Sequence, residues 1–199
     1  MTLPNKLTIA RIAAIPAMLI IACIPYLKQN TIFCSVSLAN FINLLIFVAA
    51  AVTDFFDGKI ARKHNLVTTF GKFADPLADK MLVLTSFLIL MEQSLSVTFG
   101  SVSLKTVPMW AVAIILLREL TVSGVRLVAA QKGEVIAAGW AGKVKTFETM
   151  VALFFLFLVG THQVIDVIAL VGMYISVILT VYSGAVYLYN SRKIIFESI

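Results

Sequence analysis

Charge is scarce in this chain of 199 residues. Asp, Glu, Lys and Arg together make up 13% of it, against 60% apolar residues and a mean hydropathy of +0.99. So low a charged fraction excludes an ordinary soluble domain and is typical of a multispanning membrane protein. The sequence also lacks internal repeats, low-complexity segments and linkers. We therefore expect residues 1–199 to form a single membrane domain.

Cysteine is also rare in this sequence. The two cysteines, Cys23 and Cys34, are too few to suggest a disulfide framework. The net charge of +6 could suggest a nucleic-acid partner, but the sequence offers no soluble basic face to bind one. Because the cations fall beside the predicted membrane ends, we expect anionic lipid headgroups and phosphates as partners, and no nucleic acid.

Long apolar segments take the place of the missing charges. Apolar runs of this kind predict an all-α integral membrane fold, a bundle of six transmembrane helices. The six runs without an Asp, Glu, Lys or Arg cover residues 12–27, 29–53, 81–91, 106–117, 149–165 and 167–191.

Two of these runs are too short to cross a bilayer. The third and fourth hold 11 and 12 residues, whereas a helix needs about 20 residues to span about 30 Å of hydrocarbon. We therefore expect both helices to continue into the polar residues beside them, which then face the bundle interior or a wet cavity. The polar residues gained in this way are Asp75, Asp79, Arg118, Glu119, Ser123 and Arg126.

The distribution of Lys and Arg predicts the orientation of the bundle. With six spans and Met1 inside, 14 of the 16 basic residues fall on the cytoplasmic side, and only Lys28 and Lys105 fall outside. This asymmetry predicts that both termini are cytoplasmic. Residues 4–11 are polar on one side, so we expect a short interfacial segment before the chain enters the membrane at Ile12.

Four aspartates lie within 26 residues, where the composition predicts membrane. Asp54 and Asp57 are spaced i, i+3, and Asp75 and Asp79 are spaced i, i+4, so each pair shares a helix face. A carboxylate near hydrocarbon is costly unless it is protonated, paired or bound to a cation. We expect the two faces to meet as a four-carboxylate box. Ion pairs with nearby Lys and Arg are the alternative.

The ligand chemistry of this box favours a hard divalent cation. Carboxylate oxygens suit Mg²⁺ first and Mn²⁺ or Ca²⁺ next, and the absence of Cys or His nearby, apart from His64, disfavours zinc. Four negative charges are more than one ion needs, so two ions are plausible. Two-metal sites clamp the attacking and leaving oxygens of a phosphoryl group.

The same stretch carries a family signature. From Asp54 onward it resembles the motif D-x-x-D-G-x-x-A-R-x8-G-x-x-x-D-x-x-x-D of the CDP-alcohol phosphotransferase family at all eight fixed positions. The resemblance implies a six-helix membrane enzyme, usually a homodimer, that transfers a phosphoalcohol group from a CDP-linked donor to an acceptor hydroxyl and releases CMP.

The resemblance also implies roles for individual residues. Asp54, Asp57 and Asp75 would bind a pair of divalent ions, Mg²⁺ or Mn²⁺. Asp79 would be both a metal ligand and the general base, a role that fits a hydroxyl acceptor, which is a poor nucleophile until a carboxylate takes its proton. The residues implied to line the CDP pocket are Gly58, Ala61, Arg62 and Gly71.

A second set of cations indicates the acceptor. Arg118 and Arg126 are spaced i, i+8 on the fourth predicted helix, and Lys143 and Lys145 begin the fifth. They exceed what a metal-neutralised pyrophosphate requires, so a further anion is implied. Arginine forks and lysine charges suit phosphate, which favours glycerol 3-phosphate over free serine, choline or ethanolamine. The alternative is that they are simply positive-inside residues at helix ends.

Shorter strings add to the resemblance. The start P-N-x-L-T-x-x-R at residues 4–11, R-E at 118–119 and K-x-K-T at 143–146 are similar to the phosphatidylglycerophosphate synthases. This implies transfer from CDP-diacylglycerol to glycerol 3-phosphate in the bacterial cytoplasmic membrane, with the active site facing the cytosol. The rivals are another acceptor (inositol phosphate, serine or phosphatidylglycerol) and, from a different class, a small cation transporter.

Overall fold

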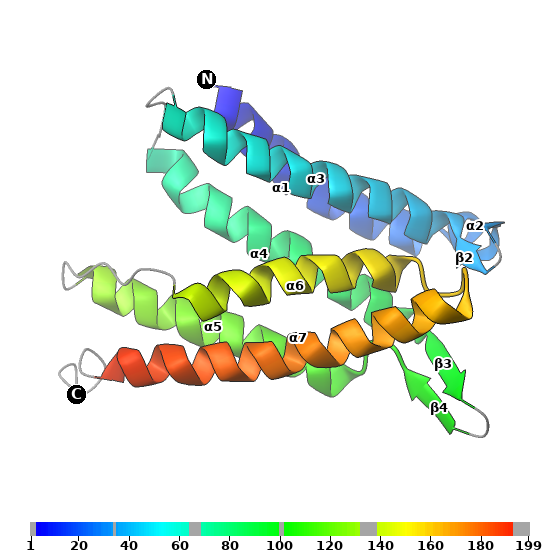
Figure 1. The fold of residues 1–199 in the computed structure, drawn as a ribbon. Helices are drawn as coiled ribbons and strands as arrows, with labels where there is room; N and C mark the ends of the chain where they lie inside the picture. The colour runs from blue at the N-terminus through cyan, green and yellow to red at the C-terminus, as the bar shows by residue number, and fades with distance from the viewer. Residues whose placement is uncertain (1–2, 34, 64–68, 100–101, 132–138, 193–199) are drawn as a thin grey trace.

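The structure is a computed structural model that describes residues 3–33, 35–63, 69–99, 102–131 and 139–192. Within these ranges the chain is almost entirely helical (Figure 1). The helices are α1 (Leu3–Cys23), α2 (Pro25–Gln29), α3 (Leu38–Lys63), α4 (Thr69–Glu92), α5 (Met109–Gln131), α6 (Trp140–Phe157) and α7 (Gln163–Asn190).

Six of these helices are long, and they correspond to the six predicted runs. The expected extension of the third and fourth runs is confirmed, because α4 includes Asp75 and Asp79 and α5 includes Arg118 and Arg126. The separate interfacial segment is not found. Residues 4–11 belong to α1, which continues without interruption to Cys23 with Pro16 inside it.

Short hairpins occupy two of the connections. Strand β1 (Thr31–Phe33) pairs antiparallel with β2 (Val36–Ser37) between α2 and α3. Strand β3 (Ser96–Phe99) pairs with β4 (Val102–Lys105) between α4 and α5. In Figure 1 both hairpins lie at the end of the bundle opposite the two termini. The start of α1 and the end of α7 lie at the same end of the bundle as the end of α3 and the start of α4 (Figure 1).

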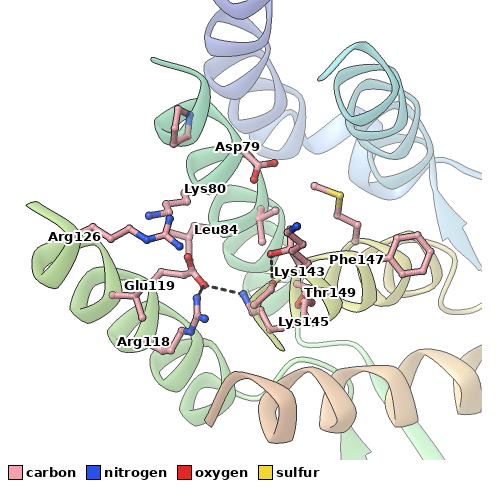
Figure 2. A pocket seen from close by; sticks show the side chains of 16 residues that line it. Asp79, Lys80, Leu84, Arg118, Glu119, Arg126, Lys143, Lys145, Phe147 and Thr149 are labelled. Atoms are coloured by element: carbon pink, nitrogen blue, oxygen red, sulfur yellow. Dashed lines mark hydrogen bonds and ion pairs between the residues drawn. The ribbon is translucent and has the colours of Figure 1, made fainter. Parts of the chain in front are cut away.

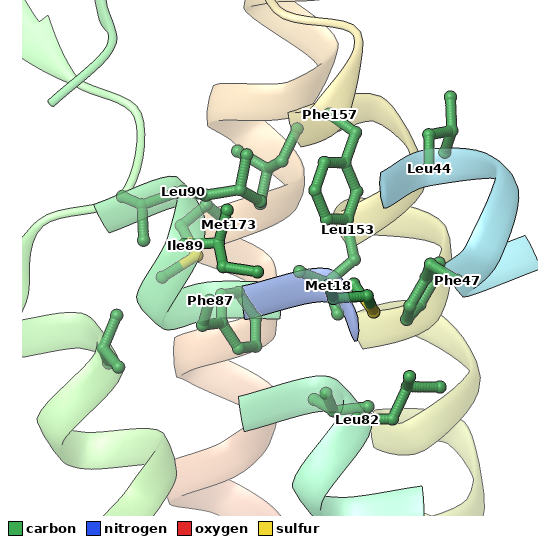
Figure 3. Packing of buried hydrophobic residues seen from close by; sticks show 14 of the residues in the cluster. Met18, Leu44, Phe47, Leu82, Phe87, Ile89, Leu90, Leu153, Phe157 and Met173 are labelled. Atoms are coloured by element: carbon green, nitrogen blue, oxygen red, sulfur yellow. The ribbon is translucent and has the colours of Figure 1, made fainter. Parts of the chain in front are cut away.

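A continuous apolar core holds the long helices together (Figure 3). Met18 of α1 and Phe87 of α4 are fully buried within it. The ring centres of Phe47 on α3 and Phe157 on α6 lie 6.1 Å apart, so these two helices contact each other through their aromatic side chains. Among helices in a membrane, close packing of such side chains stabilises the bundle through van der Waals contacts.

The outer surface of the bundle is also apolar. Large apolar side chains are exposed on every long helix, including Ile20, Leu45, Leu88, Leu117 and Ile178. A soluble monomer rarely exposes so much contiguous apolar surface, so the fold is consistent with a membrane protein. Within the described ranges, α7 is the one helix whose length and apolar content alone suit a membrane crossing. The shorter apolar stretches Leu7–Cys23 and Leu38–Asp54 lie in α1 and α3.

Candidate active site

A cavity of about 470 Å³ opens between α4, α5 and α6. Figure 2 shows Asp79 on α4 in this cavity together with charged side chains from the other two helices. The predicted base and all four predicted acceptor-binding cations contribute to its wall. The charged residues that line it are Asp79, Lys80, Arg118, Glu119, Arg126, Lys143 and Lys145.

One carboxylate, Glu119, organises the cations. Its Oε1 accepts hydrogen bonds from Arg118 Nη1 at 2.7 Å and from Lys145 Nζ at 2.9 Å. Lys145 is buried at the start of α6, whereas its neighbour Lys143 is exposed. Cations from α5 and α6 are therefore held side by side instead of pointing separately into solvent, as residues that merely mark helix ends would.

Lys80 is held by a serine of α5. Its Nζ donates to Ser123 Oγ, and this hydroxyl donates in turn to the backbone carbonyl of Glu119 at 2.5 Å. The second bond spans one helical turn, a common arrangement for serine within a helix. This contact places the Lys80 ammonium beside the turn of α5 that contains Glu119. The side chains of Lys80 and Asp79 both line the cavity.

Helix α1 contacts one carboxylate from each acidic helix. Arg11 Nη1 lies 2.5 Å from Asp54 Oδ1 on α3, and Thr8 Oγ1 donates to Asp75 Oδ1 on α4 at 2.6 Å. Thr8 and Arg11 are both buried and one helical turn apart. The same face of α1 therefore brings the acidic ends of α3 and α4 together. Asp54 remains 42% exposed, so its oxygens are accessible to a ligand.

Part of the predicted site lies outside the described side chains. Among the side chains that the structure describes, no three Asp, Glu, His or Cys residues are placed to hold one metal ion. Asp54, Asp75 and Asp79 therefore do not form such a group by themselves, and the four-carboxylate box and the CDP pocket remain predictions. The predicted residues whose side chains lie outside that part of the chain are Asp57, Gly58, Ala61, Arg62 and Gly71.

Two features of the cavity were not predicted from the sequence. The sequence predicts Glu119 in the membrane-embedded bundle without a role, and it indicates no site residue in the region of α7. In the structure Ser183 of α7 contacts Arg118, and Tyr187 of the same helix contacts Arg126. Polar residues spaced three or four apart within the apolar run 167–191 were the signal that could have indicated a polar face.

Comparisons with known proteins agree with this geometry. The sequence model of the family described as CDP-alcohol phosphatidyltransferase matches residues 1–182. A Bacillus subtilis protein named CDP-diacylglycerol–glycerol-3-phosphate 3-phosphatidyltransferase is 40% identical over 188 residues, which cover 92% of this chain and 91% of that protein. A Rickettsia bellii protein of the same name is 39% identical to this chain, and the match covers 96% of each sequence.

The matches extend over nearly the whole chain and are not limited to the aspartate motif. A protein of Sodalis glossinidius with the same name is 34% identical over 99% of this chain and 98% of its own length. Enzymes of this kind are membrane-associated and generally use divalent metals. By both the family match and the relatives, this chain belongs to the CDP-alcohol phosphatidyltransferase family.

Proposed function

We propose that this protein transfers the phosphatidyl group of CDP-diacylglycerol to glycerol 3-phosphate, giving phosphatidylglycerol phosphate and CMP. The names of the relatives support this reaction. The observation that carries it here is the cavity between α4, α5 and α6, which unites the carboxylate of Asp79 with the four predicted acceptor-binding cations. A general base and an anion-binding wall are the two parts that a phosphorylated alcohol acceptor requires.

Asp79 activates the acceptor in this proposal. Its carboxylate takes the proton of the attacking hydroxyl of glycerol 3-phosphate. The hydroxyl oxygen then forms a bond to the phosphorus of the phosphatidyl group, and the bond from that phosphorus to the CMP oxygen breaks. Positioning and charge neutralisation supply most of the rate enhancement in phosphoryl transfer, so the cations around the cavity matter as much as the base.

The cations hold the phosphate of the acceptor. Arg118 and Lys145 are fixed by Glu119, while Arg126 and Lys143 are more exposed at the cavity wall. Arg118 has five N–H donors, and its contact with Glu119 leaves others available for phosphate oxygens. An uncharged acceptor such as serine would leave these cations without an anion, which favours a phosphorylated alcohol.

Two Mg²⁺ or Mn²⁺ ions would be held by the carboxylates of Asp54, Asp57, Asp75 and Asp79. The donor set consists of carboxylate oxygens, which these cations prefer. Asp54 and Asp75 accept hydrogen bonds from one face of α1, an arrangement that supports their use in one site. When bound, the ions would neutralise the pyrophosphate of the donor and stabilise the CMP that leaves.

We infer a position for the enzyme in the cell. The six long helices would cross the bacterial cytoplasmic membrane, with both termini and the cavity on the cytosolic side. The positive-inside distribution of Lys and Arg supports this orientation. A water-soluble acceptor would then enter from the cytosol, and the lipid tails of the donor would remain among the helices. The family resemblance supports a homodimer, and the cations near the membrane ends support contact with anionic lipids.

The experiment that tests the proposal measures CMP release. Purified protein in detergent is given CDP-diacylglycerol, a divalent metal and one acceptor at a time: glycerol 3-phosphate, inositol phosphate, serine or phosphatidylglycerol. We expect release with glycerol 3-phosphate. Release only with another acceptor would show that the acceptor is wrong, and metal flux into liposomes without any CMP release would favour a transporter.

A further inference from the structure

We propose that α7, which carries none of the aspartate signature, positions Arg118 and Arg126 and thereby sets the affinity of the cavity for the acceptor phosphate. This inference rests on the proposed function, in which both arginines bind that phosphate. It assigns a positioning role to three residues of the last helix, Ser183, Gly184 and Tyr187. None of them lines the cavity itself.

A buried polar stripe runs along α7. Ser176, Thr180, Ser183 and Tyr187 follow one another at spacings of three or four residues and are all buried. Such spacing places them on one helix face. Buried polar groups in a membrane bundle are costly unless they serve a contact, so the stripe calls for partners on the helices packed against it. Helix α7 packs against both α5 and α6.

Ser183 holds the guanidinium of Arg118. Its hydroxyl accepts a hydrogen bond from Arg118 Nη2 at 3.2 Å and lies 3.3 Å from the carbonyl of Thr180, to which it donates. The other terminal nitrogen, Nη1, is bound to Glu119. The guanidinium is therefore fixed at two points, one on α5 and one on α7. A plane fixed at two points cannot rotate freely, so its remaining donors keep one direction.

Gly184 provides the space for the arginine stem. A Cβ atom at this position would lie 3.1 Å from Arg118 Cγ, closer than nine in ten real contacts of a Cβ atom. The stem of Arg118 therefore passes directly over the backbone of α7, where an added Cβ atom would require the stem to shift by a few tenths of an ångström. Because Cγ is near the base of the side chain, a displacement there moves the whole guanidinium.

Tyr187 provides a surface for the second arginine. The Cζ atom of Arg126 lies 5.6 Å from the centre of the Tyr187 ring, within the range of a cation–π interaction. Tyr187 is buried, whereas Arg126 is exposed. The ring thus gives a fixed position to a long side chain that would otherwise sample many rotamers.

Gly184→Ala is the sharpest test, and the same helix offers a matched control. At Gly172 an added Cβ would lie 3.3 Å from Ala152 Cβ on α6, so Gly172→Ala also crowds a helix contact but does so away from both arginines. We expect Gly184→Ala to raise the KM for glycerol 3-phosphate by about tenfold, the effect of misplacing one charge-assisted hydrogen bond. The KM for CDP-diacylglycerol should not change. Gly172→Ala should change neither KM.

Tyr187 is tested by a pair of substitutions. Tyr187→Phe keeps the ring and should retain the wild-type KM for glycerol 3-phosphate, whereas Tyr187→Leu removes the ring and should raise that KM. The thermal unfolding midpoint is measured for both variants. If Tyr187→Phe raises the acceptor KM as much as Tyr187→Leu does, the ring is not the positioning element and the inference is wrong for this residue.

The outcomes separate this inference from the proposed function. If the wild-type enzyme releases no CMP with glycerol 3-phosphate, the proposed function fails. If the wild-type reaction proceeds but Gly184→Ala leaves the acceptor KM unchanged, the role of α7 is wrong while the function stands. A Gly184→Ala enzyme in which both KM values rise together, or a Gly172→Ala enzyme whose acceptor KM rises as much as that of Gly184→Ala, would show a packing role alone and would overturn the inference.

Discussion

Glu119 on α5 and Lys145 on α6 form an ion pair of 2.9 Å, and the same carboxylate oxygen binds Arg118 at 2.7 Å. The side chains of Glu119 and Lys145 are 14% and 5% exposed. Without this carboxylate, the cations of the cavity would repel one another across a short distance in a medium that screens charge poorly. Glu119 is thus a structural anion, and it lets cations from two helices share one cavity.

Replacing Glu119 by Gln should destabilise the protein. Breaking a buried ion pair leaves the remaining charge uncompensated, and we expect a loss of about 3 kcal/mol in the free energy of unfolding. Thermal unfolding in detergent would measure it. Glu148→Gln is the control, because Glu148 accepts a hydrogen bond from Ser176 and, among the described side chains, forms no ion pair with a cation of the cavity. Equal midpoints for Glu119→Gln and wild type would contradict the role.

Arg118→Gln should weaken acceptor binding selectively. The guanidinium contributes charge-assisted hydrogen bonds to the phosphate, so we expect the KM for glycerol 3-phosphate to rise at least about tenfold. The KM for CDP-diacylglycerol should stay near its wild-type value. Lys143→Gln is the comparison: this lysine is exposed, so its loss should have a smaller effect. If the donor KM rises instead, Arg118 belongs to the donor site.

Asp79→Asn should abolish turnover while donor binding is retained. Asparagine has nearly the shape of aspartate but cannot accept the proton of the acceptor, and loss of a general base lowers kcat by about 10²–10⁴-fold. Binding of CDP-diacylglycerol is measured separately by titration. Asp166→Asn is the control, since Asp166 accepts a hydrogen bond from the backbone of Gly160 and does not line the cavity. A near-normal kcat in Asp79→Asn would exclude the base role.

Removal of divalent metal should stop the reaction. After treatment with a chelator, we expect Mg²⁺ or Mn²⁺ to restore CMP release and Zn²⁺ not to, because the proposed ligands are carboxylates without Cys or His. Direct titration with Mn²⁺ gives a readout independent of turnover. Asp54→Asn and Asp75→Asn should each weaken Mn²⁺ binding. Full binding in both variants would show that the metal, if needed, is held elsewhere.

The contact between Thr8 and Asp75 should be measurable in stability. Thr8→Val keeps the shape of the side chain but removes the donor of the 2.6 Å hydrogen bond. We expect a loss of about 1 kcal/mol in the free energy of unfolding. Thr8→Ser retains the hydroxyl and should lose less. Should Thr8→Ser be the less stable of the two, the methyl group and not the hydrogen bond would be what matters at this position.

The long helices could be predicted from the sequence because apolar runs are a local signal. Even the extension of α4 over Asp75 and Asp79 followed from a length argument alone. The hairpins could not be predicted, since strands of two to four residues carry too little periodicity to be recognised. The continuity of α1 through residues 4–11 was missed because amphipathic character does not distinguish a separate segment from the first turns of one helix.

The cavity was predicted only in part. That Arg118, Arg126, Lys143 and Lys145 would gather near the predicted base followed from their spacing and predicted side of the membrane, and all of them line the cavity with Asp79. The contacts that fix them did not follow. They depend on how α5, α6 and α7 are rotated relative to one another, which involves residues more than twenty positions apart. The box of four aspartates stays a prediction.

The composition of α7 has a consequence for assembly. By its length and composition this helix suits a membrane crossing, yet one side of it bears Ser176, Thr180 and Ser183. Apolar side chains pack almost equally well at many rotations of a helix about its own axis. Hydroxyl groups in lipid, by contrast, reach their hydrogen-bond partners at only one such rotation. The rotation of α7 about its own axis is therefore set by the partners of its hydroxyl groups, Glu148 for Ser176 and Arg118 for Ser183.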